Sequence, residues 1–216
     1  MAAITGVMQD YLKAVYKLQR VHGVASTSDV AARLGVSAAS ATNMIKRLAH
    51  HRLVAHTPYR GFTLTPTGER IALETIRHHR LLELYLAQAL GVSLDHVDRE
   101  AERLEHVLSD EVEARIAATL GEPTRDPHGD PIPAKDGTVR DVHYPDLTQV
   151  PPGEAGVVDR VSDRRPDLLR RLAALGVLPG VAVCVLARLS GRRFRVELGG
   201  HECVLTHDLA EGVYVR

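Results

Sequence analysis

The chain has 216 residues, 44% hydrophobic and 25% charged, as in a globular protein with one large domain or two to three small ones. No stretch approaches the roughly 18 consecutive apolar residues of a membrane span, and the N-terminus lacks the basic and apolar regions of a secretory signal. Two cysteines, Cys184 and Cys203, are too few for a disulfide framework. We therefore expect a cytoplasmic protein with no membrane partner.

The net charge of zero hides an uneven distribution of charge along the chain. Residues 1–73 carry nine Lys and Arg against three Asp and Glu, and residues 74–149 carry eight against sixteen. Residues 150–216 carry ten against eight. A basic first third favours a polyanionic partner, and an acidic middle favours cations.

Residues 1–73 predict a winged helix-turn-helix domain. An amphipathic pattern ends at Gly23, and a short helix from about Asp29 to Leu34 and a longer one from about Ala38 to His51 should follow. Residues 53–68 then predict two short strands around a Pro-Tyr-Arg-Gly turn. The apolar stripe of the first helix should consist of Val7, Tyr11, Ala14, Val15 and Leu18. The two following helices should supply a common core from Val30, Leu34, Val36, Ala41, Ile45 and Leu48.

In a helix-turn-helix, the second helix enters the major groove of DNA with its N-terminal residues nearest the bases. The candidate base-facing residues are Ser37, which is also the expected N-cap, Ala38, Ala39, Ser40, Thr42 and Asn43. Lys46 and Arg47 are placed for phosphates, and Arg60 at the hairpin tip is the expected wing contact. The alternative is a three-helix structural domain with a solvated basic face.

Residues 74–140 predict a helical domain. One helical pattern runs from Thr67 to Leu90 and ends at Gly91, and a second runs from about Asp95 to Leu120 and ends at Gly121. Residues 81–86 are more apolar than the surface helix of a monomer needs. We therefore expect a dimerisation module and a homodimer.

The second of these helices carries an unusual polar face. Glu102, Glu105 and His106 lie at i, i+3 and i+4, so they project from one side. Asp98 extends this strip, and the packing side would be formed by Leu104, Val107, Leu108 and Val112. Elsewhere, candidate ligands are Asp10 and the i, i+4 pair of His79 and Glu83. Carboxylate and imidazole groups without thiolate suit Mn²⁺ or Fe²⁺, and Zn²⁺ less selectively, but the spacing alone also fits an ordinary solvated surface.

The last part of the chain predicts a small β-barrel after a linker. Seven of the eleven prolines lie in residues 121–153, so residues 141–153 are read as a Pro-rich linker. Residues 154–216 then show five short strand patterns and one short helix, which favour an SH3-like domain. The expected fold is mostly α in the N-terminal two-thirds, with a C-terminal small β-barrel.

Six stretches of the chain resemble the diphtheria-toxin-repressor family of metal-dependent transcriptional regulators, in its manganese-responsive, three-domain form. They are DYLKAVYKL, STSDVAARLGVS, YRGFTLTPTGERIA, RHHRLLELYL, EAERLEHVLSDEVEARI and DPHGDPIP. The C-terminal domain is also similar to small ferrous-transport accessory domains. The resemblance covers essentially the whole chain in order.

The resemblance implies two metal sites. The primary site would use Asp10, Glu102, Glu105 and His106, and the second would use His79, Glu83 and Asp98, with Asp163 as a candidate from the C-terminal domain. Iron-responsive relatives typically carry softer sulfur groups in place of Asp10 and Glu102, so carboxylates there favour Mn²⁺ over the alternative, Fe²⁺. Lys13 stands where manganese regulators that lack the third domain often have a carboxylate, which favours two separated sites over a compact two-metal centre.

The expected function is therefore a Mn²⁺ co-repressor switch. The metal-loaded homodimer would bind palindromic operators in double-stranded DNA and repress metal-uptake genes. The alternatives are an Fe²⁺-dependent repressor, a metal-independent DNA-binding protein and a hydrolase with two metals. No HExxH, nucleophile elbow or phosphate loop supports an enzyme, and we expect no small organic substrate.

Overall fold

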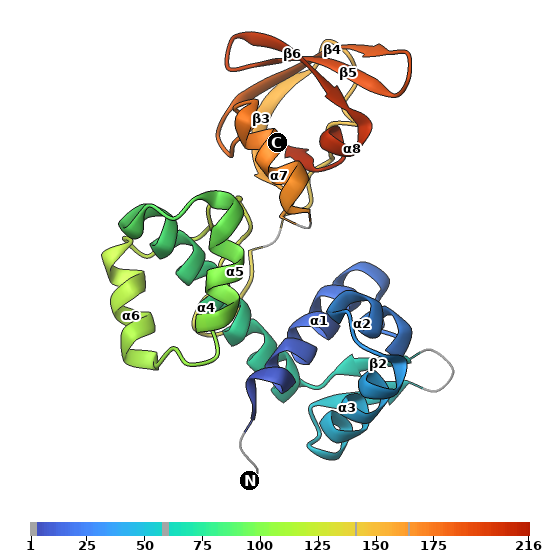
Figure 1. The fold of residues 1–216 in the computed structure, drawn as a ribbon, viewed down its shortest axis with the longest axis vertical. Helices are drawn as coiled ribbons and strands as arrows, with labels where there is room; N and C mark the ends of the chain where they lie inside the picture. The colour runs from blue at the N-terminus through green and yellow to red at the C-terminus, as the bar shows by residue number, and fades with distance from the viewer. Residues whose placement is uncertain (1–3, 58–60, 141, 164) are drawn as a thin grey trace. The chain divides into compact units, whose positions relative to one another are not determined.

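The computed structural model describes residues 4–57, 61–140, 142–163 and 165–216 (Figure 1). The chain divides into two compact units, which are described separately. Unit 1 comprises Met1–His79, Ala101–Arg115 and Pro133–Thr138, and unit 2 comprises Arg80–Glu100, Ile116–Ile132 and Val139–Arg216. Within the described ranges, no helix is long and apolar enough to cross a membrane.

Unit 1 opens with the three helices that the sequence predicts: α1 (Gly6–His22), α2 (Thr27–Leu34) and α3 (Ala38–His50). Gly23 and Gly35 end α1 and α2 in the left-handed conformation, and the Ser37 hydroxyl caps α3 by accepting from the backbone N–H of Ser40. Helix α2 begins two residues before the predicted start. The Ser26 side chain is its cap and accepts from the backbone N–H of Asp29.

The core of this helical part contains most of the side chains predicted for it, including Val15 and Leu48, which are fully buried. Val7 and Val36 differ from the prediction, because their residues are 55% and 37% exposed. Both line a surface groove beside α3 instead of the core. An exposed apolar side chain is common in a folded protein, so helical spacing alone does not separate these two valines from the core.

The wing consists of β1 (Val54–Thr57) and β2 (Gly61–Leu64), which pair antiparallel. Gly61 needs to be glycine, since a Cβ there would lie 2.2 Å from the backbone oxygen of Ala25. Residues 58–60 stand between the two strands in the sequence and include Arg60, the predicted wing contact. These three residues lie outside the described part of the chain.

The middle of the chain forms α4 (Pro66–Leu90), α5 (Leu94–Leu104) and α6 (Asp110–Thr119). The prediction of one helix from about 95 to 120 is wrong, because residues 105–109 interrupt it. The Ser109 side chain accepts from the backbone N–H of Val112 and starts α6 afresh. Glu105 and His106 therefore lie in a turn after α5, where their side chains are no longer held to the geometry of one helix face.

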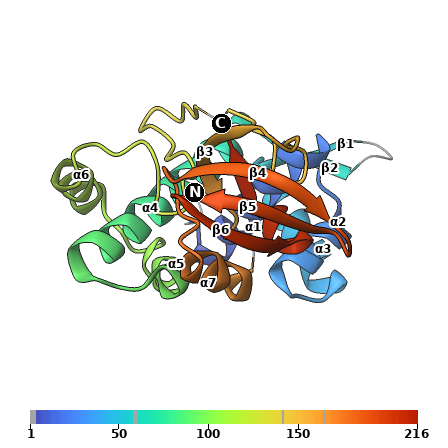
Figure 2. The same ribbon diagram turned by 90° about the horizontal axis from the view of Figure 1, so that it is seen from above.

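Unit 2 contains the predicted five-stranded SH3-like barrel. Its antiparallel sheet has the strand order β6-β5-β4-β3-β7, and β4, β5 and β6 lie side by side in Figure 2. The strands are β3 (Ala155–Val161), β4 (Ala182–Leu189), β5 (Arg193–Leu198), β6 (His201–Thr206) and β7 (Val213–Val215), with the helices α7 (Pro166–Ala174) and α8 (His207–Ala210) between them. Leu147 and Val150, from the Pro-rich segment, are buried in the barrel's core.

Candidate functional site

Three predicted ligands meet in unit 1. Asp10 lies on α1, and Glu105 and His106 lie in the turn after α5; one ligand atom from each falls within 4.8 Å of the others. The His106 Nε2 lies 2.9 Å from Asp10 Oδ1 and 3.6 Å from Glu105 Oε1. Residues 95 positions apart in the chain therefore form one polar cluster, as a metal site requires.

The His106 ring is oriented by two residues that the sequence did not single out. Its Nδ1 lies 2.7 Å from Gln9 Oε1, an amide oxygen that accepts a hydrogen bond from the ring. With Nδ1 engaged by Gln9, Nε2, which faces Asp10, is the ring nitrogen that can serve as a metal ligand. A Cβ at Gly6 would lie 3.0 Å from the His106 ring, so the glycine allows α1 to approach it closely.

Glu102 joins the cluster through Glu105. Ligand atoms of His79, Glu102 and Glu105 lie within 4.8 Å of one another, and His79 Nδ1 is 2.5 Å from Glu105 Oε2. The Glu105 side chain is completely buried, whereas that of Glu102 is 48% exposed. The structure thus brings all four predicted primary ligands together around Glu105. It also places His79, which was predicted for the second site, against the first.

Lys13 is the cation of this cluster. Its Nζ lies 2.7 Å from Glu102 Oε2 and 2.6 Å from Glu105 Oε1, and only 10% of its side chain is exposed. Burial by itself would lower the pKa of Lys13, but the two carboxylates outweigh burial and raise it above the usual value. The ammonium group therefore stays charged and contacts one oxygen of each carboxylate.

The donor chemistry of the cluster fits a divalent metal ion. Burial is the largest effect on Asp10 and raises the pKa of its carboxyl, although His106 and Lys13 act in the opposite direction. Burial would also raise the pKa of Glu105, but the hydrogen bond from His79 and the charge of Lys13 lower it overall. Carboxylates and an imidazole without sulfur are ligands that Mn²⁺ accepts readily.

A second cluster lies in unit 2 and was only partly predicted. Glu83 on α4, Asp126 and His128 are all buried and offer ligand atoms within 4.8 Å of one another. Neither ring nitrogen of His128 has a hydrogen-bond partner within the described ranges, and its Nδ1 is 3.6 Å from Glu83 Oε1. Burial, followed by the charges of Glu83 and Asp130, raises the pKa of Asp126 well above the usual value. A cation in this cluster would give a ring nitrogen of His128 a partner and would favour the ionised form of the Asp126 carboxyl.

Asp126 and His128 were missed although they lie in the stretch DPHGDPIP. The Asp126 carboxylate accepts from the backbone N–H groups of His128 and Asp130, which forms a compact turn that holds the histidine. The sequence pattern that could have identified them is an aspartate two residues before a histidine in a Pro- and Gly-rich turn. It lacks the helical spacing on which the other candidates were chosen.

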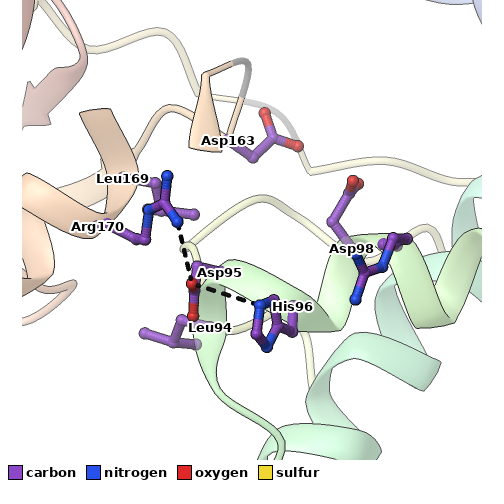
Figure 3. Close-up of a pocket in the computed structure, with 8 residues that line it drawn as sticks. Leu94, Asp95, His96, Asp98, Asp163, Leu169 and Arg170 are labelled. Atoms are coloured by element: carbon purple, nitrogen blue, oxygen red, sulfur yellow. Dashed lines mark ion pairs between the residues drawn. The ribbon is translucent and has the colours of Figure 1, made fainter. Parts of the chain in front are cut away.

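The remaining predicted ligands of the second site are Asp98 and Asp163. Asp98 is exposed on α5, with a carboxylate oxygen within 4.8 Å of one from Glu83. Asp163 lies in the loop before α7 and lines a cavity of about 250 Å³ with Asp98, Asp95 and Arg170 (Figure 3). Asp163 belongs to none of the groups of three candidate ligands found among the described residues, but its charge helps to raise the pKa of Asp126.

The predicted DNA-reading surface is exposed on α3. Ser37, Ala38, Ala39, Ser40 and Asn43 are exposed, as are Lys46 and Arg47 one turn further on. Thr42 is half-buried, and its hydroxyl donates to the backbone oxygen of Ala38, so it is the least available of the set. A groove of about 390 Å³ runs beside this surface and is lined by Val7, Tyr11, Val36, Ser40, Asn43, Met44 and Arg47.

An apolar surface remains next to the metal cluster in unit 1. Leu104, Val107 and Val112 were predicted to pack inside, but 41%, 78% and 46% of these residues is exposed. They lie close together in the chain, around the turn that carries Glu105 and His106. Neighbouring exposed apolar residues of this size are typical of a protein interface.

Comparison with known proteins gives matches along almost the whole chain. Residues 3–62 match the family model of the iron-dependent repressor N-terminal DNA-binding domain, residues 65–134 the metal-binding and dimerisation domain of the same repressors, and residues 146–216 the FeoA domain. The iron-dependent repressor IdeR of Mycobacterium leprae is 30% identical over 218 residues, which cover 95% of each chain. The regulator MntR of Geobacillus kaustophilus is 37% identical over 105 residues, covering 49% of this chain and 74% of its own.

Solved structures are also similar to this chain over nearly its whole length. A manganese-dependent transcriptional repressor in complex with manganese aligns with a TM-score of 0.87 at 40% identity, covering 96% of this chain and 98% of its own. The manganese regulator SloR aligns with a TM-score of 0.78 at 29% identity, covering 97% of each chain. The similarity thus extends over all three matched regions.

Proposed function

The chain belongs to the iron-dependent repressor family, which includes the diphtheria toxin repressor, and on that premise we propose that it is a Mn²⁺-dependent transcriptional repressor. Its homodimer binds operator DNA when the metal is bound. The observation that carries the choice of metal is the donor set of Asp10, Glu102, Glu105 and His106, three carboxylates and an imidazole without sulfur. Fe²⁺ is the alternative effector, because relatives include iron-dependent repressors.

Asp10, Glu102, Glu105 and His106 are the proposed primary ligands. Asp10 comes from the first helix of the winged-helix region, whereas the other three come from the end of α5 and the following turn. A bound divalent ion supplies a positive charge that all four ligands share. Because they come from separate segments, their common attachment fixes α1 against the turn after α5.

This attachment gives a physical route to DNA binding. A homodimer reads a palindromic operator only when its two recognition helices are spaced to match the half-sites. Fixing α1 restricts the positions that α3 of each protomer can take. If the DNA-competent state holds its ligands in a geometry that binds Mn²⁺ tenfold better, the equilibrium shifts by about 1.4 kcal/mol towards that state.

The DNA contacts assigned to this state follow from exposure and chemistry. Ser37, Ala38, Ala39, Ser40 and Asn43 face the base edges, with Asn43 as the residue able to pair with adenine. Lys46 and Arg47 contact phosphates, and Arg60 in the wing does the same. Leu104, Val107 and Val112 form part of the dimer interface.

For the second metal site we propose Glu83, Asp126 and His128, with Asp163 nearby, and the predicted set of His79, Glu83 and Asp98 remains the alternative. This choice is supported by the burial of the three ligands and by the ring nitrogens of His128, which have no hydrogen-bond partner among the described residues. His79 also contacts Glu105 of the primary cluster, so it is not committed to the second site alone. Each chain would therefore hold two separated ions, because the ammonium group of Lys13 excludes a second ion beside the first.

We assign no enzymatic activity and no small organic substrate to the protein. The proposed domain division is 1–73 for DNA binding, 74–140 for dimerisation and metal binding, and 154–216 for the SH3-like domain. A repressor works where the chromosome is, so we place it in the cytoplasm. Its targets would be genes of metal uptake, which a metal co-repressor silences when the metal is sufficient.

The test is duplex binding as a function of Mn²⁺, Fe²⁺ and Zn²⁺, with a duplex selected from a random library by the Mn²⁺-loaded protein. Mn²⁺ should stimulate binding by the wild type, and His106→Ala should abolish the stimulation while leaving the circular dichroism spectrum unchanged. Asp10→Met and Glu102→Cys should shift the response towards Fe²⁺, because sulfur is a softer ligand.

Two controls match the variants chemically. His96→Ala and Glu111→Ala remove an exposed imidazole and an exposed carboxylate outside the cluster, and both should respond to Mn²⁺ like the wild type. A His106→Ala protein that responds fully would refute the primary site. Binding by the wild type that a chelator does not affect would refute metal dependence itself.

A further inference from the structure

The hairpin formed by β4 and β5 carries a group of arginines that the proposed function does not use. Four arginines and no acidic residue lie between positions 187 and 196, and all four are exposed: Arg188, Arg192, Arg193 and Arg195. The hairpin projects at one end of the barrel, where β4 and β5 meet in Figure 1. This group is called the arginine hairpin below.

Within the part of the chain that the structure describes, no carboxylate pairs with the arginine hairpin. Arg188 donates to the backbone oxygen of Thr148, Arg193 donates to that of Ser190, and Arg192 lies 2.6 Å from the His207 ring nitrogen. None of the four makes an ion pair with a carboxylate of the described residues. At the start of α7 in the same domain, by contrast, Arg165 lies 2.6 Å from Asp167.

Positive and negative charge are separated along the same sheet. Glu197 and Glu202 are paired across β5 and β6 at the end of β5 that is remote from the arginines. The hairpin therefore presents cations alone. Residues 150–216 contain ten arginines and no lysine. A guanidinium group can bind a phosphate through two parallel hydrogen bonds, which an ammonium group cannot do.

The conformation of Arg192 adds an independent observation. It occupies the three-residue turn between β4 and β5 with a φ of 54°, in the left-handed region where glycine or asparagine is favoured. An arginine here is disfavoured by the backbone, although Gly191 directly precedes it. Strained residues are concentrated at functional positions, where a side chain is kept at the cost of stability.

From these observations we infer that the arginine hairpin binds the phosphate backbone of duplex DNA, as a second DNA-contacting surface besides α3 and the wing. Its exposed guanidinium groups match a polyanion in charge. Arg193 and Arg195 share one face of β5, where Cα atoms two residues apart are separated by about 6.8 Å, and the phosphates of one DNA strand rise about 3.4 Å per nucleotide along the duplex axis. The contact is with phosphates, so it adds affinity without sequence preference.

The experiment compares full-length, Mn²⁺-loaded proteins on the selected duplex with long flanks, over a range of salt concentrations. Each phosphate contact adds about 0.9 to the slope of log affinity against log salt. A triple Arg192→Gln, Arg193→Gln and Arg195→Gln variant should therefore have a slope shallower by about 2.7 per chain. Between 50 and 200 mM salt, the wild type should lose about 40-fold more affinity per chain than this variant, which is about 1,800-fold for a homodimer with both hairpins in contact.

The matched control changes three arginines of the same domain that lie on or beside α7, Arg165→Gln, Arg170→Gln and Arg171→Gln, and its slope should match the wild type. Equal slopes for all three proteins would overturn the inference, and so would equal reductions in both variants, which would indicate a general charge effect. The inference would also be overturned if the hairpin variant kept the salt slope of the wild type but lost an association between dimers. That result would indicate that the hairpin binds an acidic protein surface.

Arg192→Gly separates a functional role from a structural one. It relieves the left-handed strain, so its melting temperature should rise while its salt slope falls by about 0.9 per chain. A higher melting temperature with an unchanged slope would show that Arg192 makes no phosphate contact. Failure of the proposed function itself is distinguishable, because the wild type would then bind no duplex in response to Mn²⁺.

Discussion

Replacing Lys13 by glutamine tests whether its ammonium group acts as the counter-ion of the Glu102 and Glu105 carboxylates in the metal-free protein. The Lys13 ammonium lies 2.7 Å from Glu102 and 2.6 Å from Glu105, in a site where Glu105 is completely buried. Glutamine keeps most of the side-chain volume and removes the charge. In the metal-free protein, the two carboxylates then lose their counter-ion, whereas in the metal-bound protein the divalent ion still satisfies them.

The changes in stability and in Mn²⁺ affinity can be estimated from this difference between the metal-free and metal-bound proteins. Removing one partner of a buried ion pair costs about 3–5 kcal/mol, and the lower end applies because Glu102 is half exposed and partly screened by water. A loss of about 3 kcal/mol lowers the melting temperature of the metal-free protein by roughly 6–12 °C. If bound Mn²⁺ recovers half of that loss, about 1.5 kcal/mol, Mn²⁺ affinity rises about tenfold.

Calorimetric titration with Mn²⁺ and thermal unfolding without metal measure the two quantities. The control is Lys17→Gln, one turn further along α1, which should change neither of them. Lys13→Glu adds a carboxylate to the same place, so it should allow a second ion to bind beside the first. The reasoning is refuted if Lys13→Gln is as stable as the wild type without metal and binds Mn²⁺ no more tightly.

Three further predictions concern other parts of the chain. Arg47→Ala should weaken binding to every duplex alike and reduce the salt slope by about 0.9, and a loss confined to the selected sequence would contradict a phosphate contact. Burial raises the pKa of Glu113, but hydrogen bonds from Lys135 and Arg77 lower it below 4.5 overall, so its stabilising effect is present above pH 4.5 and is lost as the pH falls through the lowered value. Urea unfolding of Glu113→Gln should therefore show a deficit in neutral buffer that shrinks below pH 4.5, and a constant deficit would argue against this. His128→Ala should reduce bound Mn²⁺ by one ion per chain, as counted by equilibrium dialysis, while the ion at the primary site is kept, and an unchanged count would exclude His128 as a ligand.

Much of the architecture could be predicted because it follows from local signals. Ser37 and Gly35 mark helix ends by capping chemistry that acts over three or four residues. The five strand patterns are likewise set by alternation within short segments. The break after α5 was missed because residues 105–109 keep an apolar spacing compatible with a helix, and only the Ser109 cap indicates the interruption.

The candidate site was less predictable, because its ligands come from distant segments. Glu105 and His106 could be found from their spacing, but the position of Asp10 against them is a tertiary contact. The same holds for His79, whose contact with Glu105 the helical spacing did not indicate. Asp126 and His128 lie in an irregular turn, where no periodicity marks the side that faces inwards.

The most direct test of the switch is a Mn²⁺ titration of the full-length protein with and without saturating operator duplex. Coupling between two binding sites is reciprocal, so DNA must tighten Mn²⁺ binding by the factor by which Mn²⁺ tightens DNA binding. We predict a clear gain in Mn²⁺ affinity on the duplex, equal to that factor, which His106→Ala abolishes. Equal Mn²⁺ affinities with and without DNA would contradict the account.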